Sequence, residues 1–227
     1  MNQDQEKQLA AEASLKYVQD GQLVGLGTGS TATWAIRALG EKVRAGLKIR
    51  GIPTSQRSRE LATELGIPLT TFDEVQQLDV TIDGADEFDP NLNLIKGGGG
   101  ALLREKIVAS ATRQVVIVTD SSKQVPVLGK FPLPVEVIRF AQALVAKRIA
   151  SLGATPTLRR DAQGKPYVTD EGHHILDCSF GKIPNPAELD RTLNTIPGVV
   201  EHGLFVGMAS VVIMAKAGKV IELHPPA

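Results

Sequence analysis

The chain has 227 residues, 42% of them hydrophobic and 22% charged, which suits one large soluble domain or one domain with a smaller second one. Its 25 basic and 25 acidic residues cancel and form no long basic block, which argues against nucleic acid or an anionic membrane as the main partner. The single cysteine, Cys178, excludes an intrachain disulfide and a thiolate metal cluster.

The amino-terminal residues lack the basic start and the apolar core of a signal peptide. No apolar run approaches the roughly 20 residues that a membrane span requires. We therefore expect a cytoplasmic protein.

Strand-like and helix-like segments alternate over the first 130 or so residues. The predicted elements are a helix over 4–18, a strand over 23–26, a helix over 31–39 ended by Gly40, a strand over 47–52, a helix over 56–65, a strand over 78–82, a helix over 101–111 and a strand over 115–119. The short apolar, β-branched strands are typical of a buried parallel sheet. This order predicts a doubly wound, Rossmann-like α/β domain.

The pattern changes near Pro132 and Pro134. The elements predicted next are strands over 135–138, 155–158, 174–178 and 199–201, helices over 141–152 and 186–193, and a turn over 161–166. Their β-α-β-β-α-β order predicts a ferredoxin-like α+β domain over 131–204. A hairpin over 210–214 and 220–223 could rejoin the first domain, which would then comprise 1–130 and 205–227.

Polar residues follow three predicted strands of the first domain, and a further polar group precedes the predicted helix over 101–111. These groups are Gly27-Thr28-Gly29-Ser30-Thr31, Asp83-Gly84-Ala85-Asp86-Glu87, Lys96-Gly97-Gly98-Gly99-Gly100 and Asp120-Ser121-Ser122-Lys123. Ligands of open parallel sheets bind beyond the carboxyl ends of the strands. The groups therefore predict one site at that edge.

The run of four glycines that follows Lys96 is the most informative of these groups. A folded chain keeps such a run where the backbone must turn sharply or approach a ligand. The predicted helix that follows offers free N–H groups to an anion, and Glu105 in its first turn can reach back toward the glycines. Periodicity alone, however, favours a solvated face for Arg104-Glu105-Lys106.

Two other sites fit parts of the pattern. Gly27, Gly29 and Ala32 match the dinucleotide motif G-x-G-x-x-A, but Arg50 stands near the position where that motif expects a carboxylate, which would suit at most a 2′-phosphate. The acidic residues Asp83, Asp86, Glu87 and Asp89 could hold a divalent metal or simply form turns, and they lack the spacing of a calcium loop.

Taken alone, Lys123 is typical of a solvated loop lysine. Core or surface roles are expected for Cys178, His173 and His174.

Taken together, the four polar groups, with Glu105, resemble ribose-5-phosphate isomerase of the A type in order and spacing, over essentially the full length. The resemblance implies reversible conversion of ribose 5-phosphate into ribulose 5-phosphate, without metal or organic cofactor. It also implies a homodimer or homotetramer.

The resemblance also assigns roles to residues. The glutamate matching Glu105 is the base that moves a proton between C1 and C2, and Asp83, Asp86 and Lys96 assist ring opening and proton movement on the oxygens. The segments that line the substrate match Thr28, Gly29, Ser30 and Thr31, Asp83, Gly84, Ala85 and Asp86, Lys96, Gly97, Gly98 and Gly99, and Lys123. Two rival functions remain at this point, a non-catalytic sugar-phosphate sensor and an NADP-dependent reductase.

Overall fold

The computed structural model describes residues 2–226, which form two compact units. Of the described residues, unit 1 comprises 2–85, 104–123 and 208–226, and unit 2 comprises 86–103 and 124–207. Each unit has its own core. These bounds differ from those of the two predicted domains, whose limits stay a prediction.

A six-stranded sheet forms the centre of unit 1 in the described chain, in the order β13-β12-β6-β3-β1-β2. Its strands are β1 (Leu23–Leu26), β2 (Arg50–Pro53), β3 (Leu78–Gly84), β6 (Thr112–Asp120), β12 (Val211–Lys216) and β13 (Lys219–Leu223). All neighbours are parallel except β12 and β13, which form the predicted hairpin. The hairpin joins the first sheet through β6, as expected from the sequence.

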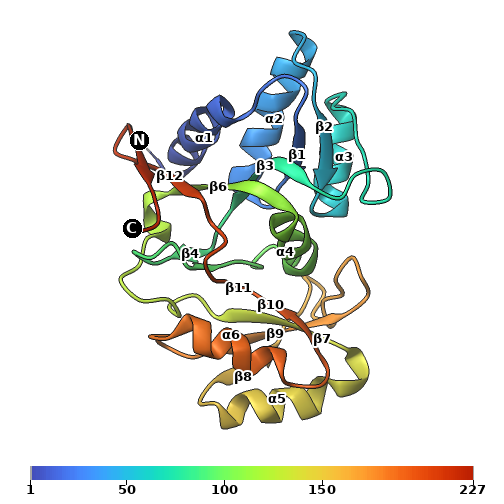
Figure 1. The fold of residues 1–227 in the computed structure, drawn as a ribbon. Helices are drawn as coiled ribbons and strands as arrows, with labels where there is room; N and C mark the ends of the chain where they lie inside the picture. The colour runs from blue at the N-terminus through green and yellow to red at the C-terminus, as the bar shows by residue number, and fades with distance from the viewer. Residues whose placement is uncertain (1, 227) are drawn as a thin grey trace. The chain divides into compact units, whose positions relative to one another are not determined.

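Helices cover both faces of this sheet, so the doubly wound prediction is confirmed (Figure 1). They are α1 (Gln3–Ser14), α2 (Ser30–Arg44), α3 (Gln56–Glu64) and α4 (Leu102–Ser110). The first three share a core with Val24 and Leu26 of β1. Gly25 lies between these two residues and faces Val108 of α4, because successive strand residues point to opposite faces.

The predicted end of α2 at Gly40 is wrong, since the helix continues to Arg44. Gly40 is buried, and a Cβ atom built there would lie 2.8 Å from the Cβ atom of Leu65 at the end of α3. The glycine therefore permits close packing of two helices and does not terminate one. The second predicted strand also begins later than expected, at Arg50.

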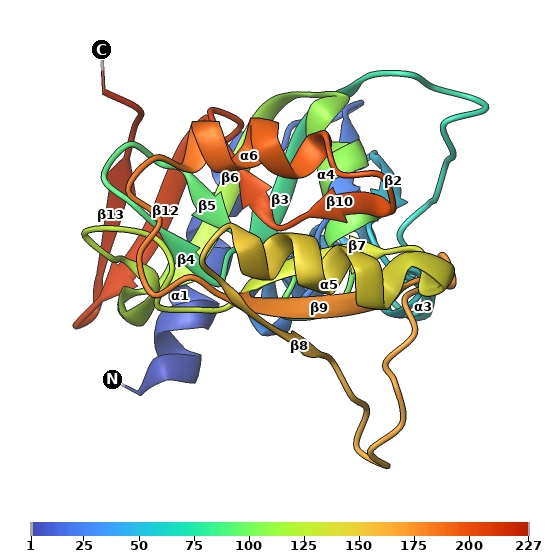
Figure 2. The ribbon, with the colours of Figure 1, turned by 90° about the horizontal axis from the view of Figure 1, so that it is seen from below.

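Unit 2 contains the predicted β-α-β-β-α-β order. Its elements are β7 (Leu133–Val137), α5 (Gln142–Ser151), β8 (Thr155–Leu158), β9 (His174–Ser179), α6 (Pro186–Asn194) and β10 (Val199–His202). The strands form an antiparallel sheet in the order β10-β7-β9-β8, as in ferredoxin-like domains. Figure 2 shows α5 and α6 side by side over one face of this sheet.

A small sheet of three two-residue strands was not predicted. It consists of β4 (Glu87–Phe88), β5 (Leu94–Ile95) and β11 (Leu204–Phe205), with β5 in the centre. Both pairs are antiparallel. This sheet holds the residue before Lys96 in a fixed register with Leu204.

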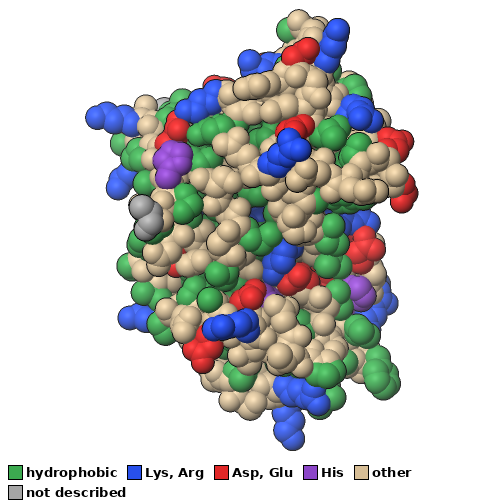
Figure 3. All heavy atoms as spheres, in the orientation of Figure 1, with side chains coloured by type: hydrophobic (Ala, Val, Ile, Leu, Met, Phe, Trp, Pro, Cys, Tyr) green, Lys and Arg blue, Asp and Glu red, His purple; other side chains and the backbone are tan. Residues whose placement is uncertain are grey.

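No helix within residues 2–226 combines the length and the apolar character needed to cross a bilayer. On the face drawn in Figure 3, basic and acidic side chains are interspersed. This distribution agrees with the balanced charge of the sequence.

Candidate active site

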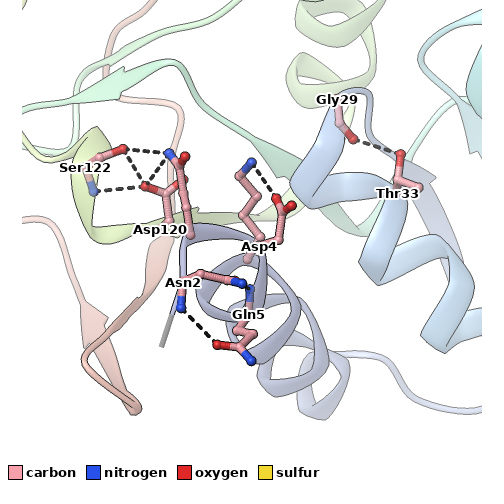
Figure 4. Close-up of polar contacts among 9 residues, drawn as sticks. Asn2, Asp4, Gln5, Gly29, Thr33, Asp120 and Ser122 are labelled. Atoms are coloured by element: carbon pink, nitrogen blue, oxygen red, sulfur yellow. Dashed lines mark hydrogen bonds and ion pairs between the residues drawn. The ribbon is translucent and has the colours of Figure 1, made fainter.

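The loop between β1 and α2 turns sharply at Gly29, the residue before the helix, where φ is +105°. A glycine adopts this conformation without the steric cost that a Cβ atom would bring. The backbone N–H and the hydroxyl of Thr33 both bond to the Gly29 carbonyl, at 2.9 and 3.0 Å (Figure 4). The first N–H groups of α2, from Ser30 onward, carry the positive end of the helix dipole.

The hydroxyl of Thr28 lies in a cluster of four hydroxyls in unit 1. Its Oγ1 atom is 2.7 Å from Oγ1 of Thr54, 2.8 Å from Oγ of Ser55 and 3.0 Å from Oγ of Ser58. Ser58 in turn donates to the Gly27 carbonyl at 2.6 Å. Sequence analysis missed this support, although Thr54 and Ser55 directly follow β2 and the strand-end rule would have pointed to them.

Asp83 links the loops that follow β1 and β3. Its Oδ1 atom accepts hydrogen bonds from the N–H of Thr28 at 3.0 Å and of Gly84 at 2.7 Å. The side chain is 2% exposed. Two of the predicted groups, the Gly27–Thr31 loop and the Asp83 turn, are therefore in direct contact.

Glu105 lies in the first turn of α4 and is only 4% exposed. The solvated face that periodicity favoured is thus wrong for this residue.

Lys123 ends a 3-10 turn, Ser121–Lys123, directly after β6. The pairing of β6 with β3 brings that turn to the same edge of the sheet as Gly84.

In unit 2, Asp86 and the glycine run are in contact. The N–H of Gly98 donates to Oδ2 of Asp86 at 2.7 Å. Lys96 is 3% exposed, and its ammonium lies 5.4 Å from the centre of the Phe205 ring. This places the charge of Lys96 over an aromatic face, where a cation is favourable.

Arg159 holds the glycine run from a distant part of the sequence. Its Nη1 atom donates to the carbonyls of Gly97 and Gly98 at 2.8 and 3.2 Å. Asp177 accepts from Nε at 2.9 Å and from Nη2 at 2.5 Å, which fixes the guanidinium in a two-point contact. Sequence analysis missed both residues, because neither belongs to a motif.

The acidic residues considered as metal ligands have other partners. Besides Asp83 and Asp86, the carboxylate of Glu87 accepts from the N–H of Gly129 at 2.8 Å and of Phe131 at 2.5 Å. That of Asp89 accepts from the N–H of Asn91 and Asn93, both at 2.9 Å. Within residues 2–226, no three His, Cys, Asp or Glu side chains are grouped as metal ligands.

The position of Arg50 contradicts the dinucleotide alternative. Arg50 pairs with Leu23 at the amino end of β1, whereas the Gly27 loop follows the carboxyl end. Its guanidinium lies 3.7 Å from the carboxylate of Glu74. It is therefore at the wrong edge of the sheet for a 2′-phosphate.

Cys178 has a core role, one of the two roles expected for it. The side chain is fully buried in unit 2, and burial raises the pKa of the thiol to about 12. A thiol with this pKa stays protonated near neutral pH and is a poor nucleophile.

The sequence model of ribose 5-phosphate isomerase A (phosphoriboisomerase A) matches residues 50–219. Ribose-5-phosphate isomerase A of Parvibaculum lavamentivorans is 52% identical over 98% of this chain and 100% of its own length. The Agrobacterium fabrum protein of the same name is 54% identical over 95% of each chain.

Solved structures give the same result. A D-ribose-5-phosphate isomerase in complex with phospho-erythronic acid superimposes with a TM-score of 0.96, at 41% identity over 99% of this chain and 100% of that one. Ribose 5-phosphate isomerase A of Methanocaldococcus jannaschii gives 0.94, at 40% identity over 97% and 99%. These relatives give no support to the sensor or the reductase. The chain belongs to the ribose 5-phosphate isomerase A family.

Proposed function

We propose that Glu105 is the base with which this chain interconverts D-ribose 5-phosphate and D-ribulose 5-phosphate. Starting from the aldose, its carboxylate takes the proton from C2. The electron pair of the C2–H bond forms the C1=C2 double bond, and the π pair of the C1=O1 bond moves onto O1, which gives the enediolate. A proton moves from O2 to O1, and Glu105 returns its own proton to C1. The observation that carries this proposal is a carboxylate in the first turn of α4 that is almost entirely shielded from water.

The enediolate needs cationic or N–H groups beside its oxygens. Lys96 provides a buried ammonium, and the N–H groups of Gly97 and Gly99 are further donors, whereas Gly98 lines the substrate and its N–H holds Asp86. Each such donor contributes about 3 kcal/mol to the transition state in a preorganised site. Asp83 and Asp86 assist ring opening and the movement of the proton between O2 and O1.

The phosphate end of the sugar is the second point of attachment. In this proposal Thr28, Gly29, Ser30 and Thr31 line the substrate, with the first N–H groups of α2 available to an anion. Lys123 adds a positive charge, and Gly84 and Ala85 complete the lining. Holding the far end of the sugar positions C1 and C2 against the base.

Substitution of Glu105 by glutamine tests the proposal, because the amide keeps the shape of the side chain and cannot accept the proton. We expect kcat with ribose 5-phosphate to fall at least about a hundredfold. Glu41→Gln, at an exposed carboxylate of α2, is the matched control and should keep kcat. A nearly unchanged kcat in a folded Glu105→Gln protein would remove the assignment.

We also infer that the enzyme acts in the cytoplasm as a homodimer or homotetramer. The balanced charge of the sequence and the family to which the chain belongs support the compartment. The family resemblance supports the assembly, which light scattering coupled to size-exclusion chromatography measures directly.

A further inference from the structure

The 3-10 turn that carries Lys123 is short. It spans only Ser121–Lys123, and a helix of this kind and length is held weakly by its backbone. Besides local bonds to Asp120, it is held by contacts from the first two turns of α1, more than a hundred residues earlier in the chain.

Glu6 of α1 makes the central contact. One carboxylate oxygen, Oε2, accepts from the N–H of Ser121 at 3.2 Å and from its hydroxyl at 2.9 Å. The other, Oε1, accepts from the N–H of Ala217 at 2.9 Å, in the turn between β12 and β13. Hydrogen bonds from these two backbone groups lower the pKa of Glu6, so the carboxylate is ionised near neutral pH.

Gln3 makes the second contact, with Asp120 and Ser122. Its Nε2 atom lies 3.3 Å from Oδ1 of Asp120 and 3.1 Å from Oγ of Ser122. The same oxygen of Asp120 accepts from the N–H and the hydroxyl of Ser122, at 2.9 and 2.5 Å. Figure 4 shows Asp120 and Ser122 beside the first turn of α1, which Asn2 and Gln5 cap by reciprocal hydrogen bonds.

Asp120 connects this network to the charge of Lys123. The side chain is fully buried, and its Oδ2 atom makes no hydrogen bond within the described residues. Burial acts to raise the pKa of Asp120, but hydrogen bonds from Ser122 and Gln3 and the charge of Lys123 outweigh it and lower the pKa. An ionised Asp120 thus attracts the ammonium three residues further along.

We propose that α1 positions Lys123 for the anionic end of the substrate, with Glu6 as the main positioning residue. The inference rests on the function proposed above, in which Lys123 contacts the substrate. Glu6 is suited to this role because all three groups that it contacts are donors, which only a carboxylate satisfies on both oxygens. A glutamine keeps one acceptor and turns its amide toward a donor.

Glu6 is separate from the part of α1 that stabilises the fold. The helix is anchored in the core of unit 1 by Ala10 and Ala11, and the chain directly after it by Leu15, all of which are buried. Removal of the Glu6 carboxylate leaves these apolar contacts in place. We therefore expect Glu6 variants to fold.

The experiment measures KM and kcat for ribose 5-phosphate in Glu6→Ala, Lys123→Ala and the double variant. We expect Glu6→Ala to raise KM about tenfold with kcat changed less than about twofold, the size expected when hydrogen bonds to a charged group are lost. When Lys123 is already alanine, Glu6→Ala should cause no further change in KM, because Glu6 acts on the substrate only through the position of Lys123. Glu6→Gln should give a smaller increase.

Glu12→Ala is the control, since Glu12 is an exposed carboxylate of the same helix that contacts Gln8. It should keep both constants. If Lys123→Ala raises KM while Glu6→Ala behaves like Glu12→Ala, the inference is wrong and the proposed function stands. An equal increase in KM from Glu6→Ala with and without Lys123 also overturns it. If Lys123→Ala leaves KM unchanged, the substrate role of Lys123 fails and the inference fails with it.

Discussion

Two glycines, Gly27 and Gly98, stand directly against carboxylates that the proposed reaction uses. A Cβ atom at Gly98 would lie 2.6 Å from Oδ1 of Asp86, the movable end of a side chain. A Cβ atom at Gly27 would lie 2.6 Å from the Cα atom of Asp83, which belongs to the backbone of β3. The same substitution should therefore act on activity at one position and on folding at the other.

We predict that Gly98→Ala folds normally and loses kcat, about a hundredfold for a displacement near 1 Å of a catalytic group. Gly27→Ala should lose about 1–3 kcal/mol of folding free energy, the usual cost of overpacking. Thermal unfolding and steady-state kinetics of the two variants, measured side by side, check both statements. Equal unfolding temperatures for the two variants would contradict the distinction.

Glu136 on β7 is a buried carboxylate outside the proposed chemistry. It is 1% exposed, and its Oε1 atom lies 2.8 Å from the hydroxyl of Thr169 and 2.9 Å from Nδ1 of His173. Burial raises its pKa above the ordinary value of 4.5, and these two hydrogen bonds oppose the change only in part. Between 4.5 and the higher folded pKa, the unfolded chain has lost a proton that the folded chain keeps.

Folding stability due to Glu136 therefore decreases as the pH rises through that window. We predict that Glu136→Gln, which keeps Oε1 as an acceptor, raises the unfolding temperature at pH 7 by about 2–4 °C, equivalent to about 1 kcal/mol in a chain of this size. Below pH 4.5 the difference should vanish. Glu64→Gln, at an exposed carboxylate, is the control. A lower unfolding temperature of Glu136→Gln at pH 7 would show that the charge stabilises the fold.

At the scale of helices and strands, local patterns predicted most of the structure. Strands 23–26 and 155–158 have the predicted bounds because short apolar or β-branched runs between turn residues have few alternatives. The end of α3 was predicted to within one residue, at 65 against the observed Glu64, and Gly66 just beyond it has a φ of +71°. At Gly40 the same rule failed, because its neighbour Leu65 comes from another helix and no local pattern records that contact.

Local sequence patterns could not predict the small sheet of β4, β5 and β11, because it also depends on contacts between distant parts of the chain. Two-residue strands carry no periodicity, and β5 pairs with β11 across more than a hundred residues. The residues of the candidate site also fall into a group that the sequence predicts and a group that it does not. The loops at Gly27, Asp83, Lys96 and Lys123 follow from motifs and strand ends. Contacts made by residues from distant elements, such as Arg159 on the glycine carbonyls, follow only from the tertiary structure.

For the whole molecule, the path of the chain makes its last segment part of its first sheet. The chain passes from unit 1 into unit 2 twice, and after the second passage it returns with β12 between β6 and β13. Residues Val211–Ala215 are buried, and β12 pairs with β6 along Val116 and Val118, which belong to the core of unit 1. The sheet of unit 1 is thus complete only when the end of the chain is present.

We predict that deletion of residues 208–227 unfolds unit 1, because it leaves the buried strand β6 with an unpaired edge and exposed apolar side chains. Deletion of residues 218–227 removes mainly β13, a half-exposed edge strand, and should leave a folded but less stable protein. Trp34, the single tryptophan, packs against the core of unit 1 and reports its state. The longer deletion should shift the emission of Trp34 to the red and abolish isomerase activity, whereas the shorter one should keep the native emission. Native emission in the longer deletion would mean that the first four parallel strands form a stable sheet without β12.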